Sequence, residues 1–107
     1  MIETKIYVGL NDSETKTQRR GTETYVGILK NVCRSYEVPF SFAVVQGGYL
    51  HADGSYTEEN TLVLSLIDAE ETKIDEIAKD LCVFFHQESV LITKDRVRAY
   101  YVKETLE

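Results

Sequence analysis

The chain has 107 residues, of which 43% are hydrophobic and 28% are charged. This length suits one domain and is too short for two independent cores, and the composition excludes a disordered or collagen-like chain. Twelve basic and eighteen acidic side chains give a net charge of -6, which disfavours general nucleic-acid binding, because such proteins present a basic surface. We therefore expect one acidic domain over residues 1–107, with no nucleic-acid partner.

No apolar run approaches the roughly 20 residues of a membrane span, and Met1 leads into a polar, alternating segment rather than a signal peptide. These features predict a cytoplasmic protein without a membrane partner. The two cysteines, Cys33 and Cys82, belong to no metal-binding or redox motif. Both fall on the apolar side of an expected helix, so we expect buried thiols, and a disulfide between the helices stays open as an alternative.

The first third of the chain predicts a strand, a loop and a helix. Apolar and polar residues alternate over 5–10, as in a strand with one buried face. The segment 11–20 is almost wholly polar and predicts a long loop. From Thr22 to Tyr36, apolar side chains recur at intervals of three and four residues, which gathers them on one helical stripe.

Two strand-like runs follow between Phe40 and Ile67. The turn between them contains Asp53-Gly54, which tolerates the positive φ of a tight hairpin turn. The first run carries the pair Gly47-Gly48, and paired glycines inside a strand indicate a bulge or a close backbone approach. We therefore expect a β-hairpin with an irregular first arm.

The last third predicts a second helix and two strands. Asp68 is placed to cap the helix, with Glu71 completing a capping box, and an apolar stripe runs on to Phe85. A short strand over 89–93 follows, and the β-branched and aromatic residues of 96–102 predict an extra C-terminal strand. The order β-α-β-β-α-β predicts an α+β, ferredoxin-like fold with an antiparallel sheet and two helices on one face.

The second face of this sheet is expected to lack a covering layer. It carries more apolar side chains than solvent-facing positions normally do: Tyr7, Ala43, Val45, Val63, Ile67, Leu91 and Tyr100. Such a patch favours a second copy packed against it, and hence a homodimer. The alternative is that the loop 11–20 or the C-terminal strand folds over the face.

Two polar groups are candidates for chemistry. Around the hairpin, His51 lies near Asp53 and Glu58 or Glu59, but without metal-ligand spacing a solvated turn with incidental charge is favoured. At the end of the second helix, Gln87 and Glu88 follow His86. They either form a semi-buried polar cluster with it or form hydrogen bonds with the free backbone groups at the helix end.

Three short segments occur in order along most of the chain: Ile6-Tyr7-Val8-Gly9-Leu10, Glu58 before Leu62-Val63-Leu64, and Phe85 followed by Gln87-Glu88-Ser89-Val90-Leu91. Together they resemble a family of small bacterial proteins of unknown function. The middle segment departs from the family pattern by carrying Glu59-Asn60-Thr61. The resemblance implies a compact α+β domain, and no activity, cofactor or catalytic residue.

Two functions stay open at this point. The first is a non-catalytic, homo-oligomeric binding or regulatory module that uses the uncovered sheet face and the hairpin. The second is a small dimeric ferredoxin-like enzyme or small-molecule-binding protein with a pocket between sheet and helices. No catalytic residue, metal or cofactor is predicted, and the candidate ligand-binding residues are Tyr7, Tyr49, His51, Glu58, Gln87 and Glu88.

Overall fold

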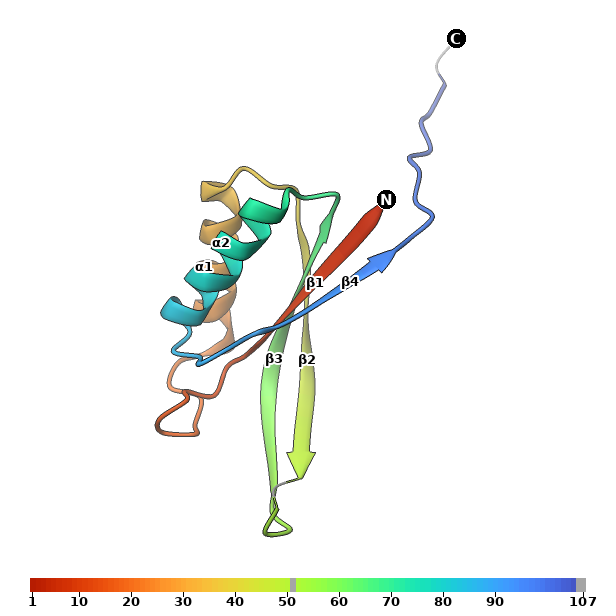
Figure 1. Cartoon of the computed structure of the whole chain (residues 1–107). Helices are drawn as coiled ribbons and strands as arrows, with labels where there is room; N and C mark the ends of the chain where they lie inside the picture. The colour runs from red at the N-terminus through yellow and green to blue at the C-terminus, as the bar shows by residue number, and fades with distance from the viewer. Residues whose placement is uncertain (51, 106–107) are drawn as a thin grey trace.

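The computed structural model describes residues 1–50 and 52–105, without the side chain of Tyr49. Its elements are β1 (Ile2–Gly9), α1 (Thr22–Ser35), β2 (Ser41–Leu50), β3 (Tyr56–Ile67), α2 (Glu71–Phe84) and β4 (Leu91–Arg96). The strands form one antiparallel sheet in the order β2-β3-β1-β4, with both helices on one face (Figure 1). The predicted α+β, ferredoxin-like fold is confirmed.

The core lies between the helices and the sheet. Alternate residues of the two central strands face the helices and are fully buried, namely Ile6, Val8, Leu62, Leu64 and Leu66. The helices cover them with the stripes expected from the sequence, and the rings of Tyr25 and Phe85 meet at 5.0 Å between centroids. Burying each such side chain stabilises the fold by roughly 1.5–3 kcal/mol before losses of conformational entropy.

The end of α2 positions the segment that follows it. His86 adopts a left-handed conformation with φ 53°. Its N–H donates to the Val83 carbonyl, and the N–H of Gln87 donates to the Cys82 carbonyl. This pattern satisfies the last helical carbonyls and turns the chain back toward the sheet. The residues after His86 are therefore held beside the end of β1.

The two thiols are free and form no disulfide bridge. Cys33 is buried as expected, and burial raises the pKa of its thiol to about 11. Cys82 is only partly buried. Each of the two helices has 14 residues, and no helix in the described part of the chain is long and apolar enough to cross a bilayer.

Two local predictions are wrong. Asp68 does not cap α2, because its carboxylate accepts a hydrogen bond from the Ile2 N–H at 2.6 Å, and the N-cap is Glu70 without a side-chain bond. The glycine pair forms no bulge, since Gly47 and Gly48 pair in register with Glu59 and Glu58. In both places a partner in the folded chain decides the local structure, namely β3 for the glycines and Ile2 for Asp68. The Asp53-Gly54 turn is consistent with its prediction, with Gly54 at φ 87°.

The extra C-terminal strand is also absent from the described residues. β4 continues to Arg96 without a turn, and Val97 still exchanges two hydrogen bonds with Met1. Beyond Val97 the chain leaves the body and has no strand beside it (Figure 1). A sequence rich in β-forming residues is therefore extended but unpaired, because a strand requires a neighbour.

The second sheet face is uncovered in this chain. The register places Tyr7, Ala43, Val63 and Leu91 on it, and Tyr100 lies instead in the C-terminal segment. Exposed fractions reach 40% at Val45, 39% at Ile67 and 61% at Leu91. Neither the loop 11–20 nor the C-terminal segment covers these residues, so the expected apolar face is accessible.

Candidate functional site

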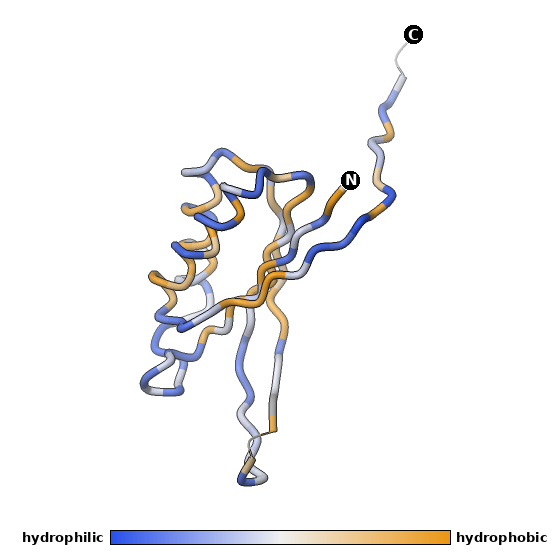
Figure 2. The backbone as a smooth tube through the Cα atoms, in the orientation of Figure 1, coloured by the Kyte–Doolittle hydropathy of each residue, from blue (hydrophilic) through white to orange (hydrophobic). Residues whose placement is uncertain are grey.

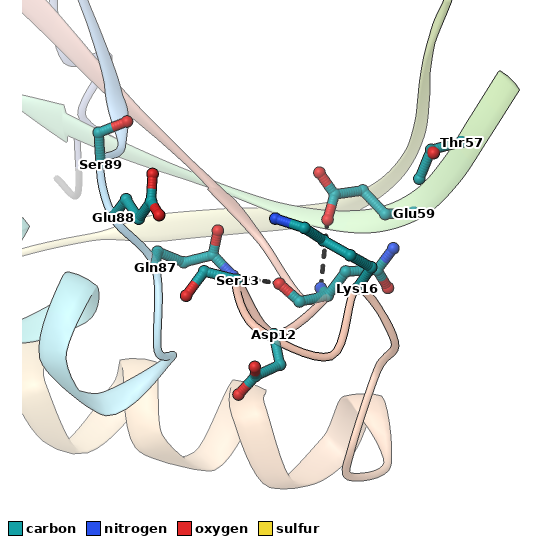
Figure 3. Close-up of a pocket in the computed structure, with 9 residues that line it drawn as sticks. Asp12, Ser13, Lys16, Thr57, Glu59, Gln87, Glu88 and Ser89 are labelled. Atoms are coloured by element: carbon teal, nitrogen blue, oxygen red, sulfur yellow. Dashed lines mark hydrogen bonds between the residues drawn. The ribbon is translucent and has the colours of Figure 1, made fainter. Parts of the chain in front are cut away.

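An open depression of about 290 Å³ lies at the end of β1, where three segments meet (Figure 3). The loop after β1, the first half of β3 and the turn between α2 and β4 form its walls. We call it the end pocket, and its lining residues are Asn11, Asp12, Ser13, Lys16, Thr57, Glu59, Gln87, Glu88 and Ser89. Thr57 and Glu59 lie an even number of residues from Val63 along β3 and therefore share its face, so the end pocket continues the uncovered sheet face.

Asp12 holds the loop in shape. Asp12 is only 4% exposed, and its Oδ1 accepts hydrogen bonds from the N–H groups of Glu14 at 2.8 Å and Thr15 at 3.0 Å. These backbone donors, assisted by Arg19 with 3.6 Å between its Nη1 and the Asp12 Oδ2, lower the pKa of the Asp12 carboxyl despite its burial. Figure 3 shows this carboxylate pointing away from the pocket, so Asp12 supports the site rather than forming its surface.

Lys16 supplies the basic group of the end pocket. Its backbone is left-handed, with φ 60°, and its N–H donates to the Asp12 carbonyl at 2.8 Å. Residues other than glycine rarely adopt this backbone conformation, so the loop holds Lys16 at some cost in backbone strain. Figure 3 shows the side chain extending into the pocket between Glu59 and Gln87. Among the described residues it makes no ion pair, which leaves the ammonium group available to a ligand.

Glu59 is fixed above Gly9. Its Oε2 accepts a hydrogen bond from the Asn11 N–H at 3.1 Å (Figure 3). A Cβ atom on Gly9 would lie 2.6 Å from both carboxylate oxygens of Glu59. Any side chain at residue 9 would therefore displace this carboxylate, and glycine allows its close approach to β1.

Gln87 ties the turn after α2 to the loop after β1. Its Nε2 donates to the Asn11 carbonyl at 2.5 Å, and the Ser13 N–H donates to the His86 carbonyl at 3.0 Å. Glu88 and Ser89 are exposed and line the opposite side of the pocket from Glu59 (Figure 3). The turn thus brings polar side chains from two distant parts of the sequence into one site.

The structure brings only part of the predicted set together. Gln87 and Glu88 line the end pocket. Glu58 is exposed and does not line it, and its neighbour Glu59 does, because alternation along β3 points the two side chains to opposite faces. Tyr7 lies on the uncovered face and lines a separate shallow trough with Val63. The prediction for His51, and that for the side chain of Tyr49, lie outside the described part of the chain.

The predicted location of the pocket is also wrong. The space between sheet and helices is filled by fully buried side chains, and the end pocket lies outside it. Sequence reasoning missed Asn11, Asp12, Ser13 and Lys16, because a polar loop gives no periodic signal. It also left out Thr57, Glu59 and Ser89 as ligand-binding residues, although the alternation of β3 places Glu59 and Thr57 on the uncovered face.

The charges of the end pocket suit a ligand that carries positive charge and a carboxylate. Glu59 and Glu88 present two carboxylates, and Lys16 presents one ammonium group. A carboxylate of a ligand would pair with Lys16, and its cationic part would pair with the glutamates. No group of three or more His, Cys, Asp or Glu side chains within residues 1–50 and 52–105 has the arrangement of a metal site.

The chain is similar in fold to solved structures of one enzyme. A phage SAM lyase in complex with S-methyl-5'-thioadenosine is 24% identical, with a TM-score of 0.67, over 88% of this chain and 79% of that chain. A phage SAM lyase in the apo state is also 24% identical, with a TM-score of 0.68, over 88% and 78%. No family model matches the sequence, and no curated protein does. At this identity, the comparison shows that the chain shares the fold of these lyases.

Proposed function

We propose that the protein binds S-adenosylmethionine in the end pocket and cleaves it as a lyase. The observation that carries the proposal is the Glu59 carboxylate, held above Gly9 by the Asn11 N–H and facing Lys16 and Glu88 across an open depression. The fold shared with the phage SAM lyases supports it. The proposal includes the cytoplasmic location expected from the sequence.

The charge of this ligand fits the site. S-adenosylmethionine has a permanently positive sulfonium, an ammonium group and one carboxylate. Glu59 and Glu88 would pair with the two cationic groups, and Lys16 would bind the carboxylate. The side-chain amide oxygen of Gln87 would accept a hydrogen bond from the ammonium or the adenine amine, because its nitrogen already donates to the Asn11 carbonyl.

The reaction requires orientation more than acid catalysis. If S-methyl-5'-thioadenosine is the product, the bond that breaks joins sulfur to the amino-acid chain. The electron pair of this bond goes to sulfur, and the neutral thioether leaves without needing a proton. As this bond breaks, the reacting carbon of the four-carbon fragment bonds to the fragment's own carboxylate oxygen and closes a lactone. Alternatively, the neighbouring carbon loses a proton to a carboxylate of the pocket, Glu59 or Glu88, and a double bond forms. Lys16 and the two glutamates would act by holding the reacting groups in place.

The test is to incubate the purified protein with S-adenosylmethionine and to follow S-methyl-5'-thioadenosine by chromatography. S-adenosylhomocysteine, which lacks the sulfonium charge, serves as a binding control. Glu59→Gln and Glu88→Gln should each lower kcat/KM at least tenfold, which corresponds to about 1.4 kcal/mol. Gly9→Ala should act like Glu59→Gln, because its Cβ displaces the same carboxylate. Glu76→Gln, on the exposed side of α2, should have no effect.

The outcomes separate the two functions left open by the sequence. Product formation that depends on Glu59 and Glu88 supports the lyase. Saturable binding without product supports the non-catalytic binding module. Absence of both binding and product refutes the proposal.

We also propose that two copies associate through the uncovered sheet face, as expected from its apolar side chains. Leu91 is 61% exposed and lies beside Tyr7 on this face. Leu91→Asp should therefore convert a homodimer to a monomer in sedimentation equilibrium. Val83→Asp is the matched control, because Val83 is 69% exposed on the helix side. A monomeric wild-type protein at micromolar concentration would refute the association.

A further inference from the structure

The two edges of the sheet differ in charge. β4, at one edge, contains Lys94, Asp95 and Arg96 among six residues. β2, at the other edge, has ten residues without any charge, and the uncharged stretch begins at Val38. Charged side chains on an edge strand hinder pairing with another chain, and a long uncharged edge permits it. β2 is therefore the edge that is open to an additional strand.

The same chain contains a strand-forming segment without a neighbour. Residues 98–105 are extended and belong to no helix or strand, although 97–102 are rich in β-forming side chains. Tyr100, Tyr101 and Val102 are 75%, 82% and 85% exposed. We call residues 98–103 the C-terminal arm. It offers unpaired backbone groups and an apolar surface that its own chain does not cover.

We propose that the C-terminal arm of one copy adds as a fifth strand to the β2 edge of a second copy. The arm does not reach its own β2, because β4 and β2 lie at opposite edges of the sheet and the arm leaves the body in the direction away from the β2–β3 hairpin (Figure 1). The β2 edge of a second copy has free backbone groups with which the arm can pair, so the arm can add to that sheet as a strand.

Charge complementarity supports this pairing. The C-terminal arm carries two basic and no acidic side chains, Arg98 and Lys103, whereas residues 1–97 carry ten basic and sixteen acidic ones. The outer half of β2 pairs with the part of β3 that carries Glu58 and Glu59, and Asp53 lies in the adjoining turn. Figure 2 shows this outer part of β3 as hydrophilic. A basic strand added to β2 would lie close to these acidic side chains.

The exposed side chains of β2 fit such an addition. Val44 is 46% exposed on the helix side of the sheet, and Val45 is 40% exposed on the uncovered face. An added strand alternates its side chains between the same two faces. Tyr100 and Tyr101 would therefore cover one valine on each face.

The shape of the molecule is consistent with an assembly of several copies. Its radius of gyration is 15.9 Å, with extents of 62 × 27 × 27 Å, compared with about 13 Å for a compact domain of about 100 residues. The β2–β3 hairpin and the C-terminal arm extend from opposite ends of the body (Figure 1). The contact joins two different surfaces, the C-terminal arm of one copy and the β2 edge of another. Copies therefore associate head-to-tail, or two copies exchange arms reciprocally and form a closed dimer.

The first test is a proline scan of the full-length protein at residues 98, 99, 100 and 101. In a paired strand, successive N–H groups point alternately toward the added neighbour and away from it. Proline at every second position should therefore raise the dissociation constant of self-association at least tenfold, and proline at the other positions should have little effect. The arm lies outside the core, so thermal unfolding at a concentration where the protein is monomeric should be unchanged and serves as the folding control.

The second test uses the acceptor edge. Val44→Lys places a charge on β2 and should weaken association like the effective prolines, whereas Val83→Lys on α2 should not. Amide hydrogen exchange of the wild type should show protection of β2, and not of β4, that rises with protein concentration. A proline scan without effect, even where Leu91→Asp dissociates the protein, would refute the arm contact and leave the sheet-face contact in place.

Discussion

The two faces of the central sheet are built from the same strands and have opposite environments. On β3, Leu62, Leu64 and Leu66 face the helices and are fully buried, whereas Val63 faces the other way and Ile67 is 39% exposed. One face is stabilised within the chain. The other face carries the trough, the end pocket and the exposed apolar residues against which a second copy is proposed to pack. Stability and binding therefore depend on alternate residues of the same strand.

The largest expected effect comes from substituting neighbours on these two faces. Leu64→Ala should lower the free energy of unfolding by about 2–5 kcal/mol, because it leaves a cavity in a filled core. Val63→Ala should cost about 1 kcal/mol or less, because its side chain is already in contact with solvent. Urea denaturation at a concentration where the protein is monomeric measures both. Equal losses would show that the uncovered face contributes to the core.

A smaller effect is expected at the loop that closes the end pocket. Because the N–H groups of Thr15 and Glu14 lower the pKa of Asp12 below 3.8, its charged form stabilises the fold above that pH. This contribution should be lost as the pH falls from 3.8 through the lower pKa of the folded protein. Asp12→Asn keeps an acceptor oxygen but removes the charge. The stability difference between wild type and variant should therefore shrink in acid, as measured by urea denaturation from pH 7 to 3.

The smallest effect, with the opposite pH dependence, is expected on the helix-covered side. The Tyr36 hydroxyl donates to Asp80 at 2.7 Å and joins the two helices. This bond raises the pKa of Tyr36 from 10.0 to about 12. Its contribution is present below pH 10 and should be lost as the pH rises from 10 to 12. The stability advantage of wild type over Tyr36→Phe should fall over this range, and an advantage that persists at pH 12 would contradict the assignment.

Hydrophobic periodicity predicted the elements of this fold and its uncovered face, but not every local conformation. Alternation on the strands and the three-to-four spacing on the helices predicted all six elements, and the order of these elements predicted which face stays open. The glycine pair and Asp68 were misread because pairing with β3 and the hydrogen bond from Ile2, which no local pattern encodes, decide their conformations. The arm was predicted as a strand from composition alone, but composition does not supply a neighbouring strand.

The amino-acid sequence by itself determined the elements, the core and the exposed apolar face, because hydrophobic periodicity is a local property that each element carries within it. Only the tertiary structure decided the end pocket. Its Glu59 carboxylate rests above Gly9, its Lys16 is presented by a loop held by Asp12, and its Gln87 reaches the Asn11 carbonyl. These residues are far apart in the chain, and their meeting depends on strand register and helix ends that no local pattern encodes.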